Sequence, residues 1–204
     1  KVAILLFFTL IFITFLGIVF ASYIVFTLSG GFNGDTETFE LSITLTKIMF
    51  PYILFISLTA LAAGILNTFL QYNLPAFTPV LLNISFIISI IFVAPILEQP
   101  IYSLAYAVII GGVVQLSTMI VGLSKIGFFS NALQIIKKND TPLFFDENIK
   151  KVFRIFFPAT FAVSIAQISL IINTNIASRL ETGSVSWLSY ADRLIEFPTA
   201  LLGV

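Results

Sequence analysis

Residues 2–29 read VAILLFFTLIFITFLGIVFASYIVFTLS and contain no charged side chain. A helix that crosses a hydrocarbon core of about 30 Å needs about 20 consecutive apolar residues, because no water is present to pair its backbone amides. The stretch meets this length and lacks the short apolar core and small-residue cleavage site of a secretory signal. It is therefore predicted to be a membrane-spanning helix.

The same length criterion, applied along the chain, predicts five complete spans. Residues 48–97 lack any charge but are too long for one crossing, and the polar, proline-containing stretch 71–79 supplies the break. Polar loops are expected at 30–47 and 125–154. The predicted fold class is an all-α, multi-pass membrane bundle whose spans are 2–29, 48–70, 79–97, 101–124 and 155–178, with a sixth span beginning near Ser184.

Composition supports the same class and excludes several functions. Hydrophobic residues make up 58% of the chain and charged residues 10%, with a mean hydropathy of +1.07, which leaves too little polar surface for a water-soluble globule. A net charge of zero argues against a nucleic-acid partner. Because both ends lie at or within apolar runs, we expect the sequence to be an internal piece of a longer protein.

Basic residues predict the orientation in the membrane, because short loops rich in Lys and Arg stay in the cytoplasm. Loop 125–154 is expected on that side, and alternation places the acidic loop 30–40 and the Glu98 turn outside. Within the loop, residues 130–145 suit either a helix lying on the membrane surface or a solvated connector. The six basic residues of the loop are Lys125, Lys137, Lys138, Lys150, Lys151 and Arg154.

Three ionisable residues, Asp192, Arg193 and Glu196, lie inside the last apolar segment. A charge inside the bilayer costs at least about 2.5–3.5 kcal/mol, so such residues usually face a cavity or a partner. Arg193 follows the interfacial Trp187 by six residues, roughly 9 Å deeper along a helix. Spacings of three and four place the three side chains on one face. The cluster is expected either to bind an anionic substrate group or to pin two helices as an ion pair.

Amides and glycines recur in the other spans. The amides are expected mainly to form hydrogen bonds between helices, with contact to substrate or ion as the alternative. Gly64, Gly111 and Gly112, together with Ala60, are expected to mark close helix packing. The amide residues are Asn67, Asn83, Gln115, Gln167, Asn173 and Asn175.

Seven motifs distributed along the chain resemble a known family. Residues 50–58 (FPYILFISL), 64–68 (GILNT), 75–79 (PAFTP) and 82–83 (LN) are similar to its fourth and fifth helices. Residues 167–174 (QISLIINT), 183–187 (GSVSW) and 190–198 (YADRLIEFP) are similar to its seventh and eighth. The family is that of the MurJ/MviN lipid II flippases, in the multidrug/oligosaccharidyl-lipid/polysaccharide exporter superfamily.

The resemblance implies a two-lobe exporter fold, of which this chain covers about helices three to eight of fourteen. Residues 1–124 would belong to the N-terminal lobe, 125–154 to a cytoplasmic interlobe linker, and 155–204 to the C-terminal lobe. The implied activity is translocation of lipid II, the undecaprenyl-pyrophosphate-linked peptidoglycan precursor, across the bacterial inner membrane by alternating access, in support of cell-wall biogenesis and cell shape. Arg193 matches the family's cavity arginine and Glu196 its acidic neighbour, with Asp192 on the same face.

The resemblance implies no catalytic residue, no metal and no cofactor, and leaves sodium or the membrane potential open as the energy source. Asn173 stands where some relatives carry a sodium-site Asp, and Gln167 is a further polar residue for the cavity or ion site. Lipid II and the phospholipid bilayer are the expected partners, with no nucleic acid. An exporter of other lipid-linked oligosaccharides or drugs, and a non-transporting scaffold, are the alternatives. An enzyme is least supported, because no nucleophile–base pair or metal cluster is visible.

Overall fold

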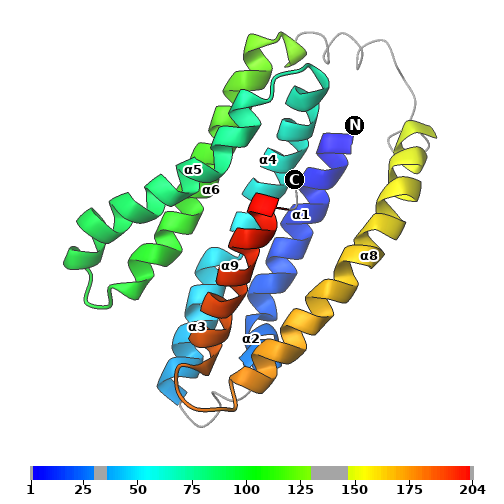
Figure 1. Cartoon of the computed structure of the whole chain (residues 1–204). Helices are drawn as coiled ribbons and strands as arrows, with labels where there is room; N and C mark the ends of the chain where they lie inside the picture. Colours follow the sequence, from blue (N-terminus) through cyan, green and yellow to red (C-terminus); the bar gives the residue numbers. More distant parts are fainter. Residues whose placement is uncertain (1, 30–35, 130–146, 203–204) are drawn as a thin grey trace. The chain divides into compact units, whose positions relative to one another are not determined.

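The computed structural model describes residues 2–29, 36–129 and 147–202, and every regular element in these ranges is helical (Figure 1). This confirms the all-α class. The hypotheses for residues 130–145 lie outside the described residues. In chain order the elements are α1 (Val2–Val19), α2 (Ala21–Ser29), α3 (Thr36–Met49), α4 (Tyr52–Thr68), α5 (Asn73–Ile88), the π-helical turn η2 (Ser89–Val93), the 3₁₀ turn η3 (Ala94–Ile96), α6 (Ile101–Lys125), α8 (Glu147–Ala177) and α9 (Ser184–Leu202).

Five helical stretches in the described part of the chain are long and apolar enough to cross a membrane, which confirms the predicted number. All five overlap the predicted spans, but only the fourth agrees at both ends to within one residue. The first ends ten residues early, the second and third begin before their predicted starts at residues 48 and 79, and the fifth begins within the predicted loop 125–154. The helix α9, which carries three ionisable residues, is not among them. The five stretches are Val2–Val19, Glu37–Thr68, Asn73–Ile96, Ile101–Lys125 and Lys150–Ala177.

The prediction of a loop over residues 30–47 was wrong from Thr36 onward, where α3 begins. Hydropathy shows where the apolar run ends, whereas a helix can continue beyond it through residues of good helix propensity. Glu37 lies in the first turn of α3 and Lys47 in its last turn, and both charges favour the helix dipole. Pro51 then separates α3 from α4.

The turn between α4 and α5 is shorter than predicted, because α5 begins at Asn73 and not at residue 79. Pro75 is the third residue of α5, where a helix has no partner for a backbone N–H and therefore tolerates proline. Leu70 adopts φ 59° directly after α4. The Gln71 N–H donates to the Leu66 carbonyl and the Leu70 N–H to the Asn67 carbonyl, both at 3.0 Å, which is the Schellman pattern of a helix C-terminus.

Two further predicted spans contain irregularities. The first span is interrupted at Phe20, between α1 and α2. The third continues from α5 into the η2 and η3 turns, where Pro95 cannot donate a backbone hydrogen bond and the regular α-helical pattern ends. The Ser89 hydroxyl donates to the Ser103 carbonyl on α6 at 2.6 Å, which ties this irregular end to a neighbouring helix.

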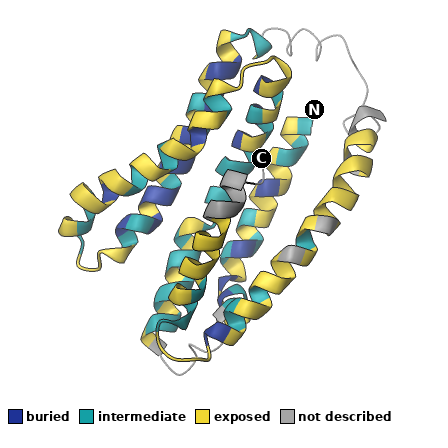
Figure 2. Cartoon of the chain, in the orientation of Figure 1, coloured by how far each residue is buried: buried dark blue, intermediate teal, exposed yellow. Residues whose placement is uncertain are grey.

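The described residues form two compact units, one within residues 1–19 and 45–152 and the other within 20–44 and 153–204. The core of the first unit consists of Ala62 and Leu66 from α4 with Met119 and Leu123 from α6. Figure 2 shows buried positions concentrated along α6, whereas most of α8 is exposed. Apolar side chains that face outward in this way are typical of helices surrounded by lipid or by other membrane helices.

Close helix packing in the first unit depends on glycine, as expected for Gly111 and Gly112. A Cβ added at Gly112 would lie 2.8 Å from the Tyr52 ring, and one at Gly111 would lie 2.6 Å from Leu82. The expectation for Gly64 was wrong, because a Cβ there meets no atom within 4 Å. Gly64 lies on a face of α4 that nothing in the described part of the chain covers.

Candidate functional site at the turn between α8 and α9

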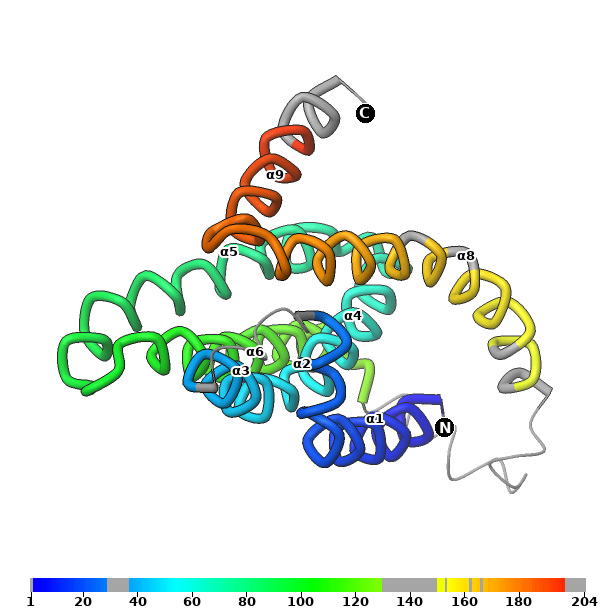
Figure 3. Tube along the Cα trace, turned by 90° about the horizontal axis from the view of Figure 1, so that it is seen from below, coloured from blue at the N-terminus to red at the C-terminus, as the bar shows by residue number. Residues whose placement is uncertain are grey.

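The predicted charge cluster lies on α9, which begins directly after a tight turn. Gly183 adopts φ +103°, a left-handed conformation that suits glycine, and its carbonyl accepts the Trp187 N–H at 2.9 Å. The chain thereby reverses between the end of α8 and the start of α9 (Figure 1), and Figure 3 shows α9 leading away from the end of α8. The second unit contains α9 and α8 from Phe153 onward.

Asp192, Arg193 and Glu196 are all exposed on α9. Within the described residues, none of the three side chains forms an ion pair or hydrogen bond with another residue, so this part of the chain offers no support for an ion pair that pins two helices. An unpaired guanidinium on a membrane helix needs water, an anionic ligand or a further protein segment beside it. The structure therefore leaves Arg193 accessible to such a partner.

Arg193 and Gln167 lie at similar depths on the two helices. Arg193 follows the start of α9 by nine residues, roughly 14 Å at 1.5 Å per residue, and Gln167 precedes the end of α8 by ten residues, roughly 15 Å. These depths are about half of a hydrocarbon core of about 30 Å. Gln167 is exposed, as Arg193 is.

Asn173 lines an open pocket of about 410 Å³ between α8 and α9. Its other lining residues are aliphatic except for Ser184, and neither Gln167 nor the charge cluster contributes to it. The structure therefore brings Asn173 together with Ser184 but not with Arg193. The lining residues are Asn173, Ile176, Ala177, Leu180, Ser184 and Leu188.

Asn175, two residues further along α8, faces a different neighbour. Two residues correspond to a rotation of about 200° around a helix, so Asn173 and Asn175 lie on nearly opposite faces of α8. The Asn175 Nδ2 atom donates to the Thr27 carbonyl of α2 at 2.8 Å, and the Arg179 Nε atom donates to the Asn175 Oδ1 atom at 3.2 Å. In the sequence, Asn175 is one of several amides in apolar spans. Its partner Thr27 lies 148 residues away, so residue spacing could not predict this hydrogen bond.

The expectation that the amides link helices is confirmed for Gln115 and Asn175. Gln115 is buried on α6, accepts a hydrogen bond from the Tyr52 hydroxyl at 3.2 Å and donates to the Thr78 carbonyl at 3.0 Å. It thereby joins α4, α5 and α6. Asn67 and Asn83 are exposed, and in the described part of the chain their side chains bond to no other residue.

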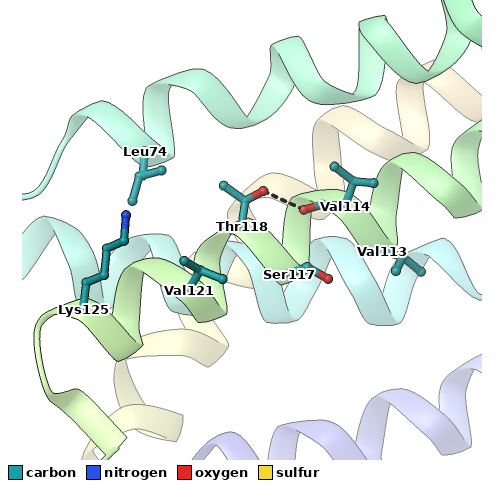
Figure 4. Close-up of a pocket in the computed structure, with 7 residues that line it drawn as sticks. All are labelled: Leu74, Val113, Val114, Ser117, Thr118, Val121 and Lys125. Carbon is teal, nitrogen blue, oxygen red and sulfur yellow. Dashed lines mark hydrogen bonds between the residues drawn. The ribbon is translucent and has the colours of Figure 1, made fainter.

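A second pocket, of about 420 Å³, lies between α5 and α6 in the first unit (Figure 4). It is lined mainly by aliphatic side chains, and the Thr118 hydroxyl donates to the Val114 carbonyl of the same helix at 2.8 Å. Lys125 is among the lining residues, and Figure 4 shows its side chain pointing toward Leu74 of α5. None of the predicted site residues contributes to this pocket.

Five apolar spans, a glycine-dependent helix core and an accessible ionisable cluster at mid-depth define a polytopic α-helical membrane protein. The family described as "Lipid II flippase MurJ" matches residues 1–204. The chain belongs to this family.

Individual relatives show how much of the family's length this chain represents. The lipid II flippase MurJ of Burkholderia cenocepacia is 54% identical over 188 residues, which are 92% of this chain and 36% of that protein. The probable lipid II flippase MurJ of Buchnera aphidicola subsp. Schizaphis graminum is 43% identical over 93% of this chain and 35% of its own length. That of Rickettsia prowazekii is 34% identical over 100% of this chain and 38% of its own. The chain thus spans little more than a third of the curated relatives it matches.

Proposed function

We propose that the protein containing this chain is a flippase that moves lipid II from the inner to the outer leaflet of the bacterial inner membrane. Membership of the MurJ family supports the assignment of lipid II as the substrate. The observation that carries the proposal is the accessible Arg193 at mid-depth on α9, without an ion-pair partner among the described residues. No bond is made or broken in this reaction, so the site needs to bind and release its substrate but not to activate it.

Arg193 would bind the pyrophosphate of the lipid. A guanidinium presents two parallel N–H groups that match two phosphate oxygens, and this contact strengthens where water is scarce. Glu196 lies three residues after Arg193, a spacing at which its carboxylate can influence the orientation of the guanidinium, and Asp192 adds a second negative charge one turn before Glu196. The lipid tail would remain in the bilayer while the charged headgroup crosses beside α9.

The fold proposed for the whole protein is the two-lobe exporter. Residues 1–124 would lie in the N-terminal lobe, 155–204 in the C-terminal lobe, and 125–154 would form the cytoplasmic linker. In such transporters the substrate site alternates between the two sides as one lobe rocks against the other.

The energy source is proposed to be the membrane potential or sodium. The pocket beside Asn173 offers amide and hydroxyl oxygens from Asn173 and Ser184 but no carboxylate. This lining offers only neutral oxygen ligands to a sodium ion.

Lipid II translocation by the full-length protein in proteoliposomes tests this proposal. Arg193→Ala removes charge-assisted hydrogen bonds that typically contribute about 1.5–3 kcal/mol, so we expect transport at limiting substrate to fall about 10- to 100-fold. Arg193→Lys keeps the charge but not the planar fork and should lose less. Lys150→Ala, which removes an exposed cation near the start of α8, serves as the matched control.

The same assay separates the alternatives. Full transport by Arg193→Ala would contradict the assigned role of the guanidinium. A parent protein that moves other lipid-linked oligosaccharides or drugs but not lipid II would be an exporter of different specificity. A parent protein that moves none of them would be a scaffold.

A further inference from the structure

The contact between α2 and α8 consists of Asn175, Arg179 and the Thr27 carbonyl, and it lies within the second unit. Thr27 is in the last turn of α2, where carbonyls commonly accept hydrogen bonds from outside their own helix. Asn175 is such a donor, at 2.8 Å. Because the Asn175 oxygen accepts from Arg179, its amide nitrogen is the atom that points to α2.

Arg179 adds an electrostatic component to the same contact. The C-terminus of a helix carries a partial negative charge, and a cation close to it is stabilising. Arg179 follows Asn175 by one turn and holds its amide at 3.2 Å, which brings the guanidinium towards the end of α2. The α2–α8 contact therefore combines a hydrogen bond with a favourable charge arrangement.

The contact lies on the side of the membrane that the basic loop predicts to be external. Loop 125–154 is expected to be cytoplasmic, so α8 runs outward and ends at the external turn before α9, and α2 ends at the acidic external loop. The observed hydrogen bond between these two ends agrees with that topology. It also joins a helix of the expected N-terminal lobe to one of the expected C-terminal lobe.

We propose that Asn175 is a gating residue of the transporter: the α2–α8 contact holds the external side closed and breaks when that side opens. The inference rests on the proposed flippase function, because only alternating access requires these helix ends to separate. A single hydrogen bond between an amide and a backbone carbonyl suits this task. It sets which residues meet, and it is weak enough to break when the lobes move. In this proposal Asn175 is a positioning residue, which acts by holding α8 against α2.

The test uses the full-length protein in a cysteine-free background, with Ser169→Cys as a reporter on an exposed position of α8. A membrane-impermeant maleimide is applied from outside in right-side-out vesicles, and from inside in inverted vesicles. Asn175→Ala removes the amide. Asn175→Asp keeps the side-chain shape and the acceptor for Arg179 but cannot donate to Thr27. Thr160→Ala is the control, because the Thr160 hydroxyl bonds to the Phe156 carbonyl of its own helix.

We expect both Asn175 variants to be labelled from outside about three times faster than the parent, the ratio that corresponds to one membrane hydrogen bond of about 0.6 kcal/mol. The control should label at the parental rate. Parental labelling rates in both Asn175 variants, or faster labelling in all three, would overturn the gating role. Faster external labelling in a protein that does not translocate lipid II would uphold the external closure and refute the flippase function.

Discussion

Substitution of Gly112 gives the sharpest test of the helix packing, because Gly64 provides a matched comparison in the same unit. A Cβ at position 112 would lie 2.8 Å from the Tyr52 Cδ2 atom and 3.0 Å from the Phe55 Cβ atom. Carbon atoms prefer separations of about 3.5–4.0 Å, so α4 and α6 would have to separate by roughly 0.5–1 Å. The Phe55 Cβ atom is fixed to its backbone, so a change of rotamer cannot relieve the overlap.

The magnitude follows from comparing the two variants. Replacing glycine by alanine in a helix interior contributes up to about 1 kcal/mol of intrinsic stability, and this gain applies equally at both positions. Overpacking of a core typically costs about 1–3 kcal/mol and applies at position 112 alone. The free energy of unfolding of Gly112→Ala should therefore lie about 1–3 kcal/mol below that of Gly64→Ala.

The measurement is equilibrium unfolding of the full-length protein in mixed micelles titrated with sodium dodecyl sulfate, followed by far-ultraviolet circular dichroism. Gly64→Ala should be as stable as the parent or more stable, because no atom lies within 4 Å of the added methyl group. Equal unfolding free energies for the two variants would refute the reasoning, since the close approach of α6 to α4 would then not constrain position 112.

The same titration checks two further predictions. Gln115→Leu should lower the free energy of unfolding by about 1 kcal/mol, because it removes two interhelical hydrogen bonds, each contributing about 0.6 kcal/mol in a membrane; no loss would show that these bonds do not stabilise the bundle. Leu70→Gly should raise it by about 1 kcal/mol, because leucine is strained at φ 59° and its side chain is 73% exposed. A lower free energy of unfolding would show that contacts of the Leu70 side chain stabilise the protein by more than the strained Leu70 backbone destabilises it.

Helix number and class follow from local sequence, whereas several helix ends do not. Apolar runs of the length of a bilayer are visible in the sequence, and the predicted span 101–124 differs from α6 by one residue. The starts of α3 and α5 were misplaced, because polar residues and first-turn prolines are compatible with a helix even where they end an apolar run.

Part of the candidate site was also predictable from local sequence. Arg193 and its two acidic neighbours are conspicuous because charges are rare in apolar segments, and their helical spacing places them on one face whatever surrounds them. Their roles in transport remain proposals. The exposure of these side chains and the inclusion of Asn173 in a pocket are properties of the folded chain.

By itself, the sequence determined that this chain is a multi-pass helical membrane protein. Unpaired backbone N–H and C=O groups are costly in lipid, and apolar runs of this length pair all of them by forming helices. Tertiary structure decided which of several similar residues have partners. Gly112 packs against Tyr52, whereas a Cβ at Gly64 meets no atom of the described residues within 4 Å. Asn175 binds α2, whereas Asn173 lines a pocket. Such differences depend on which helix lies beside each face, and that neighbour is supplied by residues far away in the chain.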